Sequence, residues 1–185
     1  MHQRFALSRS LATALAAVLV SASADSAQAV LVSYTGASGG DWATGTNWSS
    51  GAYPTSADYA VLDTTANLST DVSGSNLLAI RIGSSGTGVF NILPGGSVKA
   101  TASSNWDSAL GYGSGSNGTV NQSGGSADIN YLEVGRLVTS TYNLTGGDLL
   151  ISRGRAGNSL YLGTDDTKGV EGGTGTLEIS GGSFK

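Results

Sequence analysis

Short runs of alternating apolar and polar residues recur along the second half of this chain, and each run leads into a pair of glycines. The run at 175–184 reads Gly-Thr-Leu-Glu-Ile-Ser-Gly-Gly-Ser-Phe, and related runs occupy 88–98, 118–127 and 140–149. Alternation with a period of two predicts β-strands, because successive side chains of a strand point to opposite faces.

A second short apolar segment precedes each run and ends on a glycine. These segments lie at 80–83, 108–111, 132–135 and 160–163. The resulting unit of roughly 22 to 35 residues is typical of a repeat protein built from short strands. We therefore predict an all-β fold, a parallel β-solenoid (β-helix) of short three-strand coils stacked about 4.8 Å apart. An antiparallel β-sandwich is the alternative, since regularly spaced short strands with turn signals also suit it.

The alternation assigns a face to each side chain. The central residue of each first strand points outward, so Arg81 and Glu133 are expected on the surface. Leu162 and Leu177 are expected in the core. The predicted inward positions are Ile80, Ile82, Leu132, Val134, Leu160 and Leu162 in the first strands, Phe90, Ile92, Tyr142, Leu144, Leu177 and Ile179 in the second, and Val98, Ala100, Ala127, Ile129, Leu149 and Ile151 in the third.

The glycine pairs mark the corner between the second and third strands of each unit. Such a corner requires a positive φ at one position, which glycine adopts at low cost. Identical corners stacked on one another also leave little room for a Cβ. We predict a positive φ at Gly146 or Gly147.

Residues 1–29 have the order of a secretory signal peptide. Arg4 and Arg9 precede a short apolar run at 11–20, and small residues ending in Ala27-Gln28-Ala29 follow. The apolar run is too short to span a bilayer. We predict export to the cell surface or the extracellular space, with cleavage after Ala29 and no transmembrane segment in the mature chain.

Residues 30–79 are expected to form an N-terminal cap and the first strands, ahead of the solenoid repeats at 80–185. The cap is polar and glycine-rich but contains Trp42 and Trp48, and such a segment usually folds back to bury its rings. A spaced set of residues runs through it: Trp42, Asn47, Trp48, Gly51, Pro54, Asp58 and Ala60.

This set resembles the opening segment of bacterial passenger-type proteins built from autotransporter-associated β-strand repeats, some of which have PEP-CTERM-associated relatives. The Gly-Thr-apolar-Asn-apolar-Ser/Thr-Gly-Gly units downstream are similar to the repeats of the same group. The resemblance implies an exported, autotransporter-like β-helix. No β-barrel or sorting signal follows the units in this sequence, so we expect that the chain continues beyond Lys185 or associates end to end.

Composition narrows the chemistry that is available. The chain has 9 basic and 13 acidic residues, a formal charge of −4 and no cysteine. An acidic chain without a basic run is not expected to bind nucleic acid. The single histidine, His2, lies in the signal peptide. The mature chain therefore cannot form a Ser-His-Asp or Cys-His site, or a histidine-based zinc site.

Two catalytic hypotheses and one metal hypothesis survive this test. The adjacent acids Asp165-Asp166 would serve a glycosidase only if they opposed each other across a cleft, which neighbours in a loop rarely do. A polysaccharide lyase would use Arg153, Arg155 or Lys168 as base, with Asp165 and Asp166 holding calcium. The separate metal hypothesis is a structural calcium ion held by Asp165, Asp166 and Glu171. The spacing fits neither an EF-hand nor a calcium-binding nonapeptide. We favour solvated turn residues, and expect no catalytic residue, metal or cofactor.

One outward position of the unit is occupied by Asn91, Asn121, Asn143 and Glu178. Stacked coils align these residues in a column, which is either an amide ladder along the stack or a surface for carbohydrate or matrix, with outward Tyr161 nearby as a stacking platform. The sequence thus predicts a structural or adhesive surface module whose partner is extracellular carbohydrate or matrix. A carbohydrate-active β-helix, either a polysaccharide lyase or a glycoside hydrolase, is the alternative.

Overall fold

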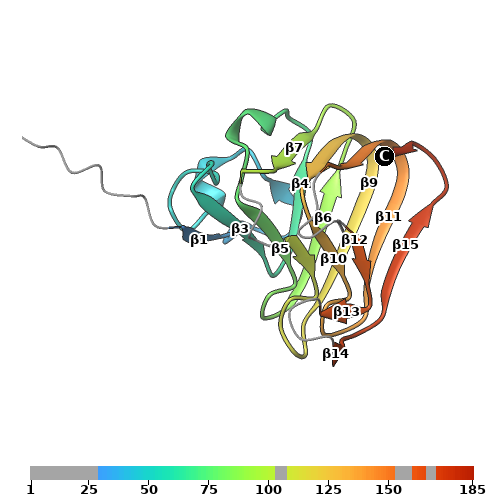
Figure 1. Ribbon diagram of the computed structural model, residues 1–185. Coiled ribbons are helices and arrows are strands. Elements are labelled where there is room, and N and C mark those ends of the chain that lie inside the picture. The colour runs from blue at the N-terminus through green and yellow to red at the C-terminus, as the bar shows by residue number, and fades with distance from the viewer. Residues whose placement is uncertain (1–28, 103–107, 153–159, 166–169) are drawn as a thin grey trace, which may run out of the picture.

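The computed structural model describes residues 29–102, 108–152, 160–165 and 170–185. Nearly all of its regular structure is β, and most strands belong to two parallel sheets (Figure 1). The six-stranded sheet contains, from edge to edge, β1 (Val30–Ser33), β3 (Asp58–Leu62), β5 (Ala79–Ile82), β8 (Ser108–Leu110), β10 (Leu132–Val134) and β12 (Leu160–Leu162).

The eight-stranded sheet follows the same chain order. From its last strand to its first, it contains β15 (Gly175–Ile179), β11 (Ser140–Ile151), β9 (Asn117–Ile129), β6 (Thr87–Ile92), β4 (Thr65–Leu68) and β2 (Gly40–Asp41), with β16 (Ser183–Phe184) beside β11 and β7 (Ser97–Ala100) beside β9. A small antiparallel pair, β13 (Thr164–Asp165) and β14 (Val170–Glu171), and two short 3₁₀ turns at Gly45–Asn47 and Ser73–Ser75 complete the elements.

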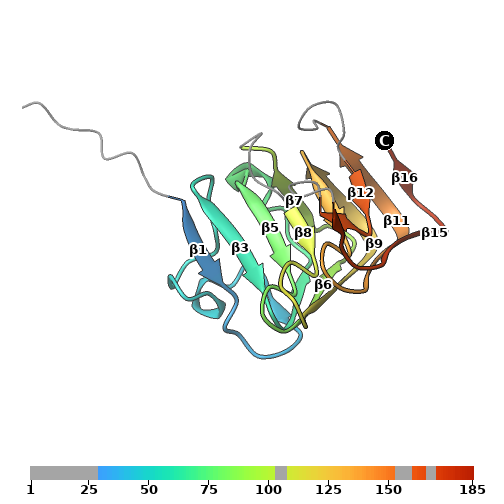
Figure 2. The same ribbon diagram turned by 60° about the horizontal axis from the view of Figure 1, so that its bottom comes forward.

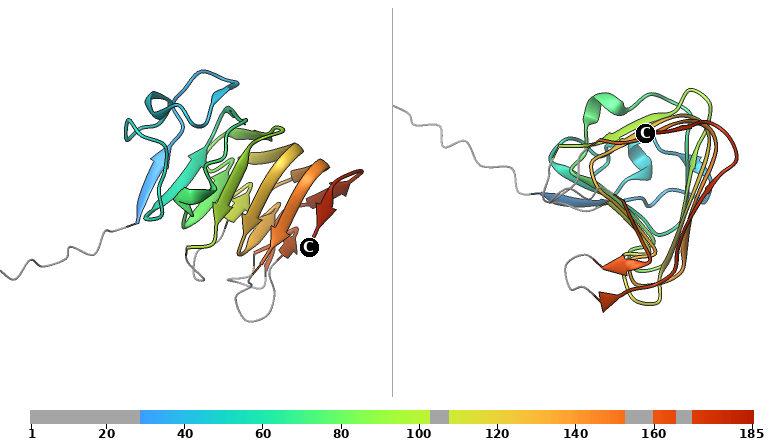
Figure 3. Two further views of the ribbon diagram at one scale, coloured as in Figure 1. Left: turned by 90° about the horizontal axis from the view of Figure 1, so that it is seen from above. Right: turned by 45° about the vertical axis from the view of Figure 1, so that its right-hand side comes forward.

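The chain passes alternately through the two large sheets. We call one strand of the six-stranded sheet, together with the strand or strands of the eight-stranded sheet that follow it, a layer. The layers follow one another in chain order from β1 to β12 (Figure 2), and the view at the right of Figure 3 shows their traces superimposed. Pairing between successive layers is parallel throughout both sheets, which excludes the antiparallel sandwich.

The core lies between the two sheets, where the apolar residues of the alternating pattern meet. The inward positions of the middle layers are at most 5% exposed, as their period-two spacing predicts. These confirmed positions are Ile80, Ile82, Phe90, Ile92, Val98, Ala100, Ala127, Ile129, Leu132, Val134, Tyr142, Leu144 and Leu149.

The glycine pairs form the corners at which β9 and β11 bend. Gly125 has φ +62° and Gly147 has φ +82°, so the predicted positive φ is confirmed. A Cβ added to Gly147 would lie 2.3 Å from the carbonyl oxygen of Gly125 in the layer below. Glycine at this corner therefore satisfies both the dihedral angle and the close approach of successive layers.

The N-terminal tryptophans close one end of the core. Trp42 and Trp48 are 0% and 2% exposed and pack edge to face, with ring centroids 4.6 Å apart. Trp48 donates from Nε1 to the carbonyl oxygen of Trp42 at 2.7 Å, and the Trp42 ring lies 4.8 Å from that of Phe90. The aromatic residues of segment 34–48 thus cover the first layers, because burying their rings removes a large apolar area from water.

The opposite end of the stack differs from the sequence expectation. Leu162 is 45% and Ile179 50% exposed, while Leu160 and Leu177 are half-buried. These side chains do point along the inward rows of their strands. No further layer within the described residues covers them, so the prediction that Leu162 is a core residue is wrong.

Candidate functional site

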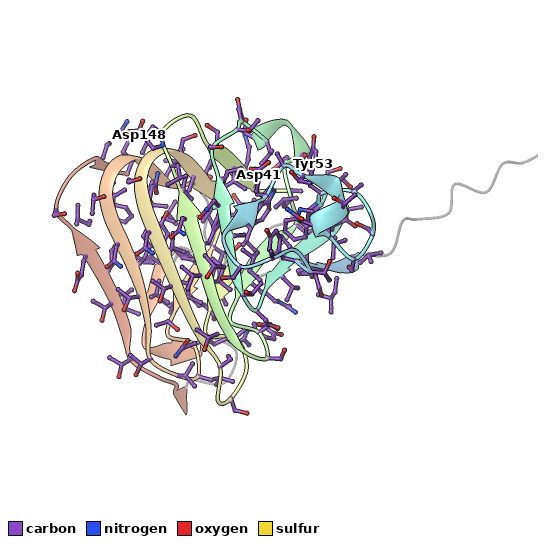
Figure 4. All side chains as sticks on the ribbon, turned by 180° about the vertical axis from the view of Figure 1, so that it is seen from behind. Asp41, Tyr53 and Asp148 are labelled. Atoms are coloured by element: carbon purple, nitrogen blue, oxygen red, sulfur yellow. The ribbon has the colours of Figure 1, made fainter. Side chains whose placement is uncertain are left out.

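The predicted asparagine column forms a hydrogen-bonded ladder on the outer face of the eight-stranded sheet, the face seen in Figure 4. Asn91 donates from Nδ2 to Oδ1 of Asn67 at 2.7 Å, Asn121 donates to Asn91 at 2.9 Å, and Asn143 donates to Asn121 at 2.9 Å. The sequence analysis missed Asn67, which precedes the recurring units but occupies the same register. Each of these amide–amide hydrogen bonds is a rung of the ladder. Successive layers are therefore joined by side-chain hydrogen bonds as well as by backbone pairing.

A backbone carbonyl fixes the direction of this ladder. Asn67 donates from Nδ2 to the carbonyl oxygen of Gly39 at 2.7 Å. A carbonyl oxygen only accepts hydrogen bonds, so every amide above it must turn its Oδ1 toward the later layer. The last amide, Asn143, is paired in register with Glu178, whose carboxylate also only accepts when ionised. No hydrogen bond joins the side chains of these two residues.

Tyr161, the other residue predicted for this face, does not lie beside the column. Tyr161 belongs to β12 of the six-stranded sheet, whereas the asparagines belong to the other sheet, so it provides no stacking platform for them. The backbone of Asp165 pairs with Val170 in the β13–β14 pair. Arg153, Arg155, Asp166 and Lys168 lie outside the described residues, and the hypotheses that use them stay predictions.

A cluster of tyrosines and arginines covers the outer face of the six-stranded sheet. The Arg81 guanidinium lies 4.7 Å above the Tyr59 ring and 3.8 Å above the Tyr112 ring. Arg136 lies 4.6 Å above the same Tyr112 ring. These cation–π contacts connect β3, β5 and the turns after β8 and β10. We call Tyr59, Arg81, Tyr112, Tyr131, Glu133, Arg136 and Tyr161 the tyrosine–arginine cluster.

Glu133 anchors the cluster and corrects a second expectation. Its position in β10 is outward, as the alternation predicts, yet its side chain is fully buried rather than exposed. Its carboxylate is 3.3 Å from Nη1 of Arg136 and accepts a hydrogen bond from Oη of Tyr131 at 3.3 Å. The Tyr131 ring lies 5.2 Å from that of Tyr161. A buried carboxylate is tolerated here because it is paired and hydrogen-bonded.

A polar pair, Gln122 and Tyr142, lies among apolar side chains of the interior. Gln122 is 0% exposed and accepts at Oε1 from Oη of Tyr142 at 2.6 Å, while its Nε2 donates to the carbonyl oxygen of Asp148 at 3.0 Å. Burial raises the pKa of Tyr142, so its hydroxyl stays a donor. A cavity of about 10 Å³ beside Tyr142 has a mostly aliphatic and aromatic lining. A space of that size and polarity holds no ligand.

The Asp63 carboxylate links the turn after β3 to the turn after β5. Asp63 accepts backbone hydrogen bonds from Ser84, Ser85 and Gly86 and a fourth from the Ser85 hydroxyl, at 2.6 to 3.2 Å. Burial raises the pKa of Asp63, but these hydrogen bonds to the charged form outweigh it and the net pKa is lowered. All of these contacts hold the turn, and none presents a reactive group.

Within the ranges that the structure describes, there is no group of three or more aspartate, glutamate, histidine or cysteine side chains placed to hold a metal ion. No helix in that part of the chain is long and apolar enough to cross a membrane. Comparison of the chain with family models, curated proteins and solved structures finds no match.

The tyrosine–arginine cluster escaped the sequence analysis for a physical reason. Its members come from five successive layers, and they meet through the pairing of strands far apart in sequence rather than through a local motif. The available signal was the alternation itself, which placed Arg81, Glu133 and Tyr161 at the same outward position of three first strands.

Proposed function

We propose that this chain is a β-solenoid that serves as a structural or adhesive module of an exported protein. Each layer adds one strand to the six-stranded sheet and one or two strands to the eight-stranded sheet. The register is kept from β3 through β12 in the first sheet, and from β4 through β15 in the second apart from a bulge where β9 and β11 bend. That repeated register is the observation that carries the proposal, because stacking of like layers around a continuous core defines a solenoid.

The stabilising groups of this stack suit a rigid scaffold. The asparagine ladder bonds neighbouring layers, the corner glycines allow their close approach, and a continuous apolar core fills the space between the sheets. Such a molecule presents flat side faces on which identical positions repeat about every 4.8 Å. A repeating face matches a repeating polymer, and carbohydrate or matrix is the partner class that we propose.

The proposal assigns no catalytic role to the chain. The described polar clusters consist of ladder amides, a turn-binding aspartate, a buried glutamine–tyrosine pair and the tyrosine–arginine cluster. Most of their groups contact neighbouring side chains or backbone. None places two carboxylates across an open cleft, which is the geometry that glycoside hydrolysis requires.

A paired binding and turnover assay tests this function. The purified chain is passed over immobilised acidic and neutral polysaccharides, and the same polysaccharides are incubated with it and analysed for released sugar. We expect retention on at least one polysaccharide without release of product. Turnover abolished by Asp165→Asn or Arg153→Ala would establish the carbohydrate-active alternative instead.

A further inference from the structure

Basic side chains are few in this acidic chain, and Arg81 differs from the other described ones because no carboxylate in the described part of the chain lies within ion-pair distance of it. Four basic side chains lie within the described residues, and three of these lie within 4 Å of a carboxylate. The three pairs are Lys99 with Asp128, Arg136 with Glu133 and Lys185 with Asp148. Arg81, the fourth, has no carboxylate partner in that part of the chain.

Arg81 is instead held by aromatic rings. Its guanidinium lies over the rings of Tyr59 and Tyr112, and its Nε is enclosed without an acceptor among the described residues. The side chain as a whole is only half-buried. Contacts with ring faces stabilise the charge but satisfy none of the guanidinium N–H groups. The terminal nitrogens therefore remain for an acceptor that the neighbouring side chains do not supply.

The partly exposed members of the tyrosine–arginine cluster form a row along the stack. Arg81, Tyr112, Arg136 and Tyr161 are each half-buried and come from four successive layers, beginning at β5 and ending at β12. At about 4.8 Å per layer, this row is roughly 14 Å long. Beneath it, Tyr59, Tyr131 and Glu133 are at most 4% exposed and fix the positions of the row.

We propose that this row binds a carboxylate-bearing polysaccharide laid along the stack, with a sugar carboxylate on Arg81 and a sugar ring against Tyr161. A planar guanidinium offers two parallel N–H bonds to a planar carboxylate, and this pairing is stronger than a bond between neutral groups. Tyrosine combines a flat apolar face with a polar edge, which suits a sugar ring. The inference rests on the proposed adhesive function and names its ligand class and its face.

Calorimetric titration with polygalacturonate tests the site. Its fully methyl-esterified form keeps the backbone but lacks the charge, and dextran sulfate carries a different anion. We expect binding to polygalacturonate alone, weakened by raising NaCl from about 0.05 to 0.5 M. Arg81→Ala should lower the affinity at least about tenfold, since it removes a charge-assisted pair. Arg81→Lys should lower it less, because an ammonium keeps the charge but loses the paired geometry.

Lys99→Ala is the matched control, because it removes one positive charge from the other sheet. It should bind polygalacturonate as the unmodified chain does. Thermal unfolding followed by circular dichroism verifies that each variant folds, and Arg81→Lys carries the test if Arg81→Ala does not fold.

Equal affinities of the unmodified chain and Arg81→Lys, equal binding of the esterified polymer, or binding of dextran sulfate alone would each overturn the site. Retention on a neutral polysaccharide, unchanged by Arg81→Ala, would overturn it while leaving the adhesive function intact. Retention on no polysaccharide at all would overturn both.

Discussion

Gln122 occupies an inward position that Ile92 and Leu144 occupy in the adjacent layers. Its Oε1 is satisfied by the hydroxyl of Tyr142, and the residue is fully buried. Tyr142→Phe would leave that oxygen without a donor, which costs about 1 to 3 kcal/mol. We expect this loss in the free energy of unfolding measured with urea.

The double variant Tyr142→Phe with Gln122→Leu is the control for this prediction. It replaces both partners by apolar groups, as in the neighbouring layers, so it should recover part of the lost stability. If the double variant were no more stable than Tyr142→Phe, an unsatisfied Gln122 would not be the cause of the loss.

Asp63 makes stability depend on pH in a defined direction. Its pKa is lower in the folded chain than in the unfolded one, so the unfolded state binds protons more readily. The contribution of the carboxylate is therefore complete above the unfolded pKa, near 4, and disappears as the pH falls through the folded value. Because the group is partly solvated, we expect Asp63→Asn to cost only about 1 to 2 kcal/mol at pH 7.

Urea unfolding of Asp63→Asn and the unmodified chain between pH 7 and about pH 2 tests this prediction. The difference between the two midpoints should shrink as the pH drops. Asp148→Asn is the control, since Asp148 is exposed and its partner Lys185 lies at 3.8 Å on the surface. A constant difference across the series would contradict the linkage.

At the scale of the element, the corner between the two halves of β11 combines two constraints that substitution can separate. Gly147→Ala would place an alanine at a positive φ and would also bring its Cβ within 2.3 Å of a backbone oxygen. Gly115 has φ +77° but nothing within 4 Å of an added Cβ. Gly115→Ala should thus cost about 1 to 2 kcal/mol, the dihedral penalty alone, and Gly147→Ala about 3 kcal/mol or more.

Urea midpoints of the two glycine variants measure this difference. Equal losses would show that the stacked corner relaxes enough to admit a methyl group, and the close approach of layers would then not be what requires glycine.

The asparagine ladder predicts a stabilising substitution at its upper end. Asn143 turns Oδ1 toward Glu178, which offers no donor when it is ionised. Glu178→Asn would present an Nδ2 donor in the same register and add a rung, worth about 0.5 to 1.5 kcal/mol. Glu178→Ala removes the charge without adding a donor, so a thermal stabilisation that it shared with Glu178→Asn would indicate charge removal rather than ladder extension.

Much of this element structure follows from the sequence, because strand periodicity alone places side chains on faces. It predicts the buried rows, the outward asparagines and the positive φ at a corner glycine correctly. It fails for Glu133, since a period of two tells which face a residue occupies but not whether that face is covered. Periodicity also does not separate the outer faces of the two sheets, so it groups Tyr161 with asparagines that belong to the other sheet.

For the whole molecule, the two ends of the stack differ in character. The N-terminal segment buries two tryptophans over the first layers, whereas the last described layer presents Leu162, Ile179 and Phe184 at 42% to 50% exposure. Its strands β12 and β15 are also the outermost members of their sheets. Unpaired strand edges beside exposed apolar side chains favour pairing with another chain.

We therefore predict concentration-dependent association of the purified 185-residue chain through this end. Light scattering should show a mean mass that rises with concentration. The double variant Leu162→Glu with Ile179→Glu should remain monomeric, because it places charges on the open layer. Leu150→Glu introduces a charge at a leucine of similar exposure on the side of the stack, and it should associate like the unmodified chain. A mass independent of concentration in the unmodified chain, or equal loss of association in both variants, would show that the open layer is not the contact.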